Sequence, residues 1–187
     1  MVLRLSGGRR LQSPPGDTAR PTPSRVRLAV MNMLAAELPG ASWLDLCCGS
    51  GVMGCEALQR GAQRVVAVDQ DRRMATTARS NLELVAAGQN RPVTVQVVQQ
   101  DVLRWLRQGN GSARPFELIY ADPPYAAGLY EDLAAGVRQG AWIQQRGVLL
   151  LECASASPAH VPEGWSLIKQ KRYGTSTVLM LALLEQA

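Results

Sequence analysis

Metal-binding patterns are almost missing from this sequence. It has four cysteines and a single histidine, His160, and no two cysteines form a CxxC pair. Cys47 and Cys48 are adjacent, which does not match the ligand spacing of zinc sites, and His160 has no partner at a useful distance along the chain. We therefore expect no metal ion and no disulfide framework, and we interpret the cysteines as small buried side chains.

Long apolar runs are also absent. No stretch of 18 or more apolar residues occurs, and the chain does not start with the charged and then apolar pattern of a signal sequence. A hydrophobic content of 47% in 187 residues is ordinary for a globular protein and sufficient for a core without disulfides. These features predict a cytoplasmic protein without a membrane partner, and we expect a monomer.

Acidic residues are scarce in one place, the beginning of the chain. Residues 1–30 hold one aspartate and six arginines, whereas the charges of the remaining residues cancel, so the net charge of +5 belongs to this segment. The arginines are Arg4, Arg9, Arg10, Arg20, Arg25 and Arg27. Because the planar guanidinium suits bidentate contacts with phosphate, the segment is predicted to contact nucleic acid. A disordered, solubilising tail is the alternative.

The rest of the sequence alternates between apolar strands and amphipathic helices. Strands are expected at 42–48, 64–69, 93–98, 116–121 and 147–153, with helices at 52–60, 71–88, 102–107 and 129–139. A helix starting near Thr22 precedes them, and two strands that flank Tyr173-Gly174 form a closing antiparallel β-hairpin. This order predicts an α/β fold with a doubly wound, Rossmann-like sheet over 41–187, preceded by a basic arm and helix over 1–40 that face nucleic acid. Residues 1–21 are rich in glycine, proline, serine and arginine and are expected to form an extended arm.

A glycine-rich turn follows the first expected strand. Gly49, Ser50 and Gly51 begin a formal GxGxxG pattern, and Asp69 stands at the end of the next strand. Glycines let the backbone approach a ligand closely, and an acid at that strand end can bind ribose hydroxyls. Taken alone, the pattern fits NAD, FAD and S-adenosylmethionine equally.

Two further acids favour S-adenosylmethionine. Asp45 precedes the glycines inside the strand, where a carboxylate suits the cationic amino end of a methionine group and would repel a pyrophosphate. Asp101 follows the third strand, where the amino group of adenine needs an acceptor. With Asp69 and Asp122, these acids are expected at the edge where open α/β sheets bind their ligands.

The sequence Asp122-Pro123-Pro124-Tyr125 follows the fourth expected strand. Proline ends the strand and keeps the preceding residue extended, so the Asp122 carboxylate is held at the strand end. Asp122 and the carbonyl of Pro123 can accept hydrogen bonds from an exocyclic amino group, and a base can stack on Tyr125. Since methyl transfer depends mainly on alignment of the nucleophile, the pattern predicts methylation of an amino nitrogen.

These motifs resemble those of the RsmD-like bacterial 16S rRNA (guanine-N2)-methyltransferases over nearly the whole chain. The similar segments are RPTPSRVRLAVMNML, LDLCCGSGVMGCEALQRGA, VVAVDQD, DPPY and RYGTSTVLMLAL. The resemblance implies a seven-stranded methyltransferase sheet, S-adenosylmethionine as the methyl donor, and small-subunit ribosomal RNA in an assembled or assembling 30S particle as the substrate. By position, it implies cofactor contacts from Asp45, Gly49, Ser50, Gly51, Asp69 and Asp101, and guanine contacts from Asp122, Pro123 and Tyr125.

Three alternatives remain open for the same residues. Relatives that methylate adenine N6 or a protein glutamine amide tend to have asparagine at the position of Asp122, so the carboxylate favours guanine. A dehydrogenase-like nucleotide-binding protein would share the glycine turn, but Asp45 and the DPPY sequence argue against it. A non-catalytic RNA-binding module would use the basic segment alone and transfer no methyl group.

Overall fold

The computed structural model describes residues 3–13, 24–111, 113–124 and 128–184 and divides into two compact units. Unit 1 comprises residues 1–100 and unit 2 comprises residues 101–187. The boundary at residue 40, between the basic arm with its helix and the sheet domain, stays a prediction. The described part of the basic arm and the first helix belong to unit 1 because they pack against its second helix.

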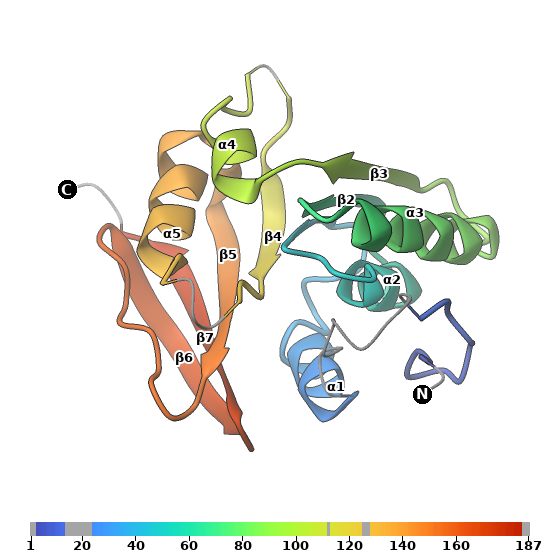
Figure 1. Cartoon of the computed structure of the whole chain (residues 1–187), viewed down its shortest axis with the longest axis horizontal. Helices are drawn as coiled ribbons and strands as arrows, with labels where there is room; N and C mark the ends of the chain where they lie inside the picture. Colours follow the sequence, from blue (N-terminus) through green and yellow to red (C-terminus); the bar gives the residue numbers. More distant parts are fainter. Residues whose placement is uncertain (1–2, 14–23, 112, 125–127, 185–187) are drawn as a thin grey trace. The chain divides into compact units, whose positions relative to one another are not determined.

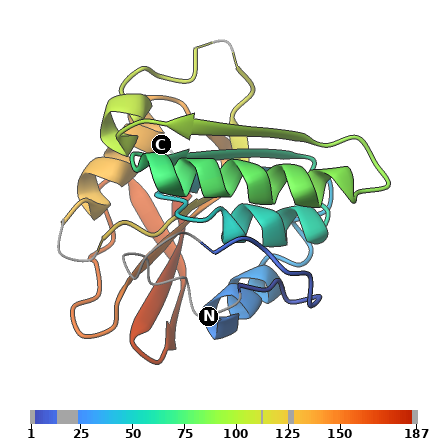
Figure 2. The same ribbon diagram turned by 45° about the vertical axis from the view of Figure 1, so that its right-hand side comes forward.

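Unit 1 is a three-stranded parallel sheet with three helices. Its elements are α1 (Ser24–Met33), β1 (Ser42–Leu46), α2 (Val52–Gln59), β2 (Arg64–Asp69), α3 (Arg72–Ala87) and β3 (Thr94–Gln99). The strand order is β3-β2-β1, and α2 and α3 lie side by side against the strands (Figure 1 and Figure 2). All five residues of β1 are buried, whereas none of β3 is, so the core of the unit lies around β1, β2 and the two helices.

Unit 2 holds the other four strands and two helices. Its elements are α4 (Val102–Leu106), β4 (Phe116–Ala121), α5 (Tyr130–Gln139), β5 (Ile143–Ala154), β6 (Trp165–Tyr173) and β7 (Ser176–Leu183). β4 is parallel to β5, and β7 pairs antiparallel with both β5 and β6, which gives the order β4-β5-β7-β6. Trp105 and Trp142 stack with ring centroids 4.0 Å apart, and this pair joins α4 to the start of β5.

The fold class predicted from the sequence is confirmed. The seven strands form a mixed sheet with helices, and the chain ends in the antiparallel hairpin of β6 and β7. The helix expected at 71–88 begins one residue later, because the Asp71 carboxylate caps it by accepting hydrogen bonds from the backbone N–H groups of Arg73 and Met74. The fifth strand is longer than expected and already begins at Ile143.

The described part of the basic arm, residues 3–13, is folded rather than extended. Its backbone turns back on itself through a bridge between Arg4 and Arg10. Leu3, Leu5 and Leu11 are buried, and this explains the difference: three apolar side chains gain free energy by packing on the unit, about 25 cal/mol for each Å² removed from water. Residues 14–23, including Arg20, lie outside the described part of the chain.

Candidate cofactor and base sites

The glycine turn joins β1 to α2 through backbone that only a few residue types adopt easily. Gly49 and Gly51 have φ angles of 53° and 73°, and Cys47 before them has 59°. The turn is fastened to the end of β2, because Gly49 N donates to Asp69 Oδ2 at 2.8 Å and Cys48 N donates to the carbonyl of Val68 at 3.0 Å. The predicted turn and the predicted strand-end acid are thus brought into direct contact within unit 1.

The third glycine of the pattern has a packing role. A Cβ atom at Gly54 would lie 2.9 Å from Val65 Cγ1 and 3.2 Å from Leu82 Cδ2. Gly51 is similarly tight, since its Cβ would lie 3.0 Å from the Cβ of Ala78. Without side chains at these positions, α2 can approach α3 and β2 closely, which sets the position of the turn at the start of α2.

Asp69 is half-buried and holds two backbone amides. Besides Gly49 N on Oδ2, its Oδ1 accepts a hydrogen bond from Asp71 N at 2.9 Å. Burial raises the pKa of the Asp69 carboxyl above its usual value, and the two amides oppose that rise. Each carboxylate oxygen can accept a second hydrogen bond, so Asp69 keeps acceptor capacity beside the turn.

Asp45 lies deeper than the sequence suggested. It is 1% exposed, and its Oδ2 accepts a hydrogen bond from Gly54 N in the first turn of α2 at 3.1 Å. The pKa of the Cys48 thiol lies well above its usual value. Burial is the largest cause, and the carboxylates of Asp45 and Asp69 raise the pKa further. The turn therefore has a negative electrostatic environment, which suits a cationic ligand group and disfavours a pyrophosphate.

Sequence reasoning missed Asn81, a buried residue on α3. Its side chain is 0% exposed; Nδ2 donates to the carbonyls of Ser50 and Gln12, both at 3.0 Å, and Oδ1 accepts from Gln12 N at 2.8 Å. One amide thus links the middle of the glycine turn to the basic arm. The sequence shows only that Asn81 is a polar residue on the apolar face of a helix. This does not indicate which groups its side chain binds.

A second link to the arm involves Glu56 on α2. Glu56 is 0% exposed, and its Oε1 accepts hydrogen bonds from both the N and the Oγ of Ser6 at 2.9 Å. Arg27 Nε lies 4.0 Å from the same Oε1, and Arg27 Nη2 donates to the carbonyl of Arg4 at 2.9 Å. Burial lowers the pKa of Arg27, and the Glu56 carboxylate partly restores it.

The arginines predicted to contact RNA therefore fall into different environments. Arg4, Arg9, Arg10 and Arg25 are exposed, whereas Arg27 is 5% exposed. The interpretation of Arg27 changes accordingly, because a guanidinium enclosed by Glu56 and the arm supports the fold and is shielded from phosphate. Arg9 lines a surface hollow together with Ser6, Leu28 and Arg60, so part of the basic charge surrounds a concave surface.

Unit 2 places the other candidate residues at element ends. Asp101 is exposed and caps α4, its Oδ1 accepting from Arg104 N at 2.8 Å. Asp122 directly follows β4 and is half-buried, and Pro123 after it is buried. Tyr125 lies outside the described residues. The prediction that the strand ends at Asp122 is confirmed.

A buried polar pair lies close to the end of β4. Tyr120 and Glu152 are each 1% exposed, and the Tyr120 hydroxyl donates a hydrogen bond to the Glu152 carboxylate. Ala121 and Leu151 are paired residues of β4 and β5, so Glu152 follows at the level of Asp122. Nothing in the sequence pattern singled out Glu152, because one acid in an apolar strand gives no indication of its partner.

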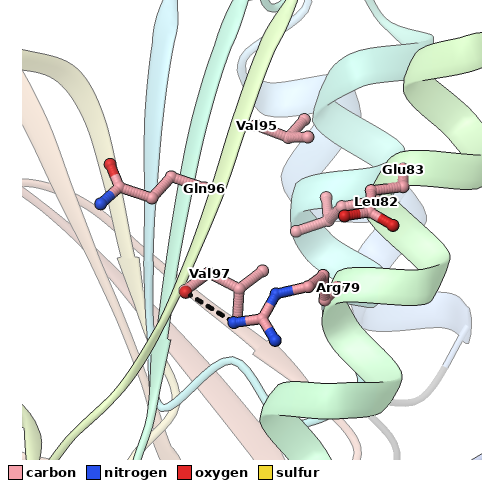
Figure 3. Close-up of a pocket in the computed structure, with 6 residues that line it drawn as sticks. All are labelled: Arg79, Leu82, Glu83, Val95, Gln96 and Val97. Atoms are coloured by element: carbon pink, nitrogen blue, oxygen red, sulfur yellow. Dashed lines mark hydrogen bonds between the residues drawn. The ribbon is translucent and has the colours of Figure 1, made fainter.

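The pocket between α3 and β3 contains none of the predicted site residues. Arg79, Leu82, Glu83, Val95, Gln96 and Val97 line it, and Arg79 Nη2 donates to the carbonyl of Val97 at 3.2 Å (Figure 3). Across the described ranges, no helix is both long and apolar enough to span a membrane. The same residues include no group of three or more His, Cys, Asp or Glu side chains suited to a metal ion.

Known proteins resemble this chain in sequence and in fold. The family model described as Conserved hypothetical protein 95 matches residues 5–182. Ribosomal RNA small subunit methyltransferase D of Escherichia coli K12 is 31% identical over 178 residues, which cover 92% of this chain and 85% of that protein. Its counterpart from Haemophilus influenzae is 28% identical over 93% of this chain and 88% of that protein. A solved structure, the putative methyltransferase yhhF from Escherichia coli, superimposes with a TM-score of 0.82 at 29% identity, and both chains are covered completely.

Proposed function

Because the chain belongs to the RsmD-like methyltransferase family, whose model is described as Conserved hypothetical protein 95, we propose that it methylates the exocyclic N2 of a guanine in small-subunit (16S) ribosomal RNA. The methyl donor is S-adenosylmethionine, and the substrate is an assembled or assembling 30S particle. Sequence-specific recognition of RNA relies on displayed single-stranded bases and on shape, and a particle presents both. The protein acts as a monomer.

The cofactor proposal is supported by the glycine turn and its acids. S-adenosylmethionine supplies an electrophilic methyl group. A Cβ atom at Gly49 would meet no other atom within 4 Å, so a ligand can approach the backbone there, and Asp69 has acceptor capacity for ribose hydroxyls. Asp101 would accept a hydrogen bond from the adenine amino group. The carboxylates of Asp45 and Asp69 give the turn the negative environment that a cationic sulfonium and amino group require.

The chemistry at the guanine depends on the residues that follow β4. The lone pair of a guanine N2 is delocalised into the ring, which makes it a weak nucleophile. The Asp122 carboxylate and the carbonyl of Pro123 would accept hydrogen bonds from its two N–H groups. These bonds would favour a pyramidal nitrogen whose lone pair is aimed at the methyl group. In taking a methyl group from bound S-adenosylmethionine, N2 would lose one proton, and the Asp122 carboxylate would accept that proton. Tyr125 would hold the base by stacking.

One observation supports this proposal: half-buried Asp122 and buried Pro123 directly follow β4 in a chain of this family. Its test is the transfer of labelled methyl groups from S-adenosylmethionine to small subunits that lack their own methylations, followed by nucleoside analysis. The wild-type protein should give labelled N2-methylguanosine. The Asp122→Ala variant should lose roughly 100-fold or more in rate while retaining RNA binding.

The matched control is Asp132→Ala, which removes an exposed carboxylate on α5 of the same unit and should leave the rate unchanged. Label in N6-methyladenosine or in a protein glutamine would overturn the guanine assignment and keep the methyltransferase. RNA binding by the wild-type protein without any transfer would instead support a non-catalytic module.

A further inference from the structure

The last hairpin presents a basic, solvent-exposed strand. Every residue of β6 from Leu167 to Arg172 is exposed, and the chain's only two lysines, Lys169 and Lys171, are among them. Neither acid type occurs between Trp165 and Leu183. Among the described residues, the two ammonium groups have no hydrogen-bond or ion-pair partner, so their charge is available to a ligand.

Strand register places the end of β6 at the same edge of unit 2 as Asp122. Ala121 of β4 pairs with Leu151 of β5, Leu151 pairs with Leu179 of β7, and Leu179 pairs with Gln170 of β6. β6 runs in the same direction as β4. Lys171 therefore follows Gln170 at the level at which Asp122 follows Ala121, and Arg172 is one residue further along. Figure 1 shows the arrowheads of β4 and β5 and the turn between β6 and β7 directed to the same side of the unit.

The separation across the sheet fits a short stretch of nucleic acid. Three strand spacings of about 4.8 Å separate β4 from β6, which amounts to roughly 14 Å. A lysine side chain extends several further ångströms from its strand. Phosphates one or two nucleotides from a base held at Asp122 therefore come within reach of Lys171. Lys169 lies two residues earlier on the same strand, so its side chain leaves the same face and extends the basic row.

We propose that Lys169 and Lys171 on β6 form a substrate-strand surface, which binds the phosphates of the single-stranded RNA that flanks the target base. This inference rests on the proposed function, because it assumes a base held at Asp122. Lysine ammonium groups act as point charges for phosphate. The surface adds to the exposed arginines of the arm in unit 1.

The test compares two double variants that each remove two positive charges from unit 2. Lys169→Gln with Lys171→Gln changes the proposed surface. Arg107→Gln with Arg146→Gln changes two exposed arginines, one at the C-cap of α4 and one on β5. Dissociation constants for small-subunit RNA are measured over a range of salt concentrations. Methyl transfer and S-adenosylmethionine binding are measured on the same preparations.

RNA binding by the lysine variant should depend less on salt than binding by the wild type. In a plot of log K against log salt concentration, the magnitude of the slope should fall by about 1.4, which is about 0.7 for each lost phosphate contact. Its KM for RNA should rise by roughly tenfold or more while kcat stays within about twofold, because phosphate contacts act equally on ground and transition states. S-adenosylmethionine binding should be unchanged, and this shows that the variant is folded. The arginine variant should behave like the wild type.

If the wild-type protein transfers methyl groups but the lysine variant has the same salt slope and the same KM as the wild type, this proposal is overturned. An absence of transfer by the wild type would count against the proposed function instead. If the variant bound naked RNA normally and failed only on particles that carry ribosomal proteins, the surface would contact a protein, and the RNA proposal would again be overturned.

Discussion

Replacement of Asn81 by alanine should weaken both the fold and the binding of S-adenosylmethionine. The side chain makes three hydrogen bonds, two to Gln12 and one to the carbonyl of Ser50 in the glycine turn. At about 1 kcal/mol for each, their loss should destabilise the protein by about 3 kcal/mol. The contact with Ser50 also fixes the turn, and its loss should weaken S-adenosylmethionine binding by about fivefold, the equivalent of about 1 kcal/mol.

Asn110→Ala provides the matched control in unit 2. Asn110 is 7% exposed, and its Nδ2 donates to the carbonyls of Ala113 at 2.8 Å and Ala141 at 3.3 Å. This variant should lose about 2 kcal/mol of stability with no change in S-adenosylmethionine affinity. Urea denaturation gives the stabilities, and isothermal titration calorimetry below the unfolding range gives the affinities. Unchanged S-adenosylmethionine affinity in a folded Asn81→Ala protein would refute the role of Asn81 at the turn.

Three further predictions follow from buried charges and thiols. Arg27→Ala should cost about 3 kcal/mol in urea denaturation, since it leaves the Glu56 carboxylate buried without its cation, and a cost below about 1 kcal/mol would contradict this ion pair. Burial raises the pKa of Asp69 in the folded state above its value in the unfolded state. As the pH rises from the unfolded-state pKa to the folded-state pKa, ionisation of this group should therefore lower the free energy of unfolding. S-adenosylmethionine affinity should fall as the pH drops through that raised pKa, and calorimetry should find this dependence missing in Asp69→Asn. Iodoacetamide should modify half-buried Cys47 before fully buried Cys55, whose pKa burial raises strongly, and mass spectrometry of the labelled peptides will report the order.

The sequence predicted those parts of the fold that depend on local pattern. Alternating apolar strands and amphipathic helices are sufficient to infer a doubly wound sheet, and Pro123 and Pro124 are sufficient to end β4 at Asp122. The glycine turn and its contact with Asp69 were likewise predictable, because strand ends of a parallel sheet meet at one edge.

The parts that escaped prediction depend on contacts between distant residues. The arm was expected to be extended because its glycines, prolines and arginines resemble a linker. The three leucines that fold it are too few to indicate which core they would enter. Arg27 was grouped with the exposed arginines because its partner Glu56 stands on another helix. Asn81 could not be assigned to the turn for the same reason.

The way in which the arm is fastened has a consequence for biosynthesis. Ser6 and Gln12 bind side chains that lie 50 and 69 positions later in the sequence, so the arm leaves the ribosome well before its partners exist. During that interval Leu3, Leu5 and Leu11 have no core to enter. The arginines around them give the nascent segment a strong positive charge, which opposes its aggregation. The same charges therefore act twice, first to keep a newly made segment in solution and later on the surface of the folded unit.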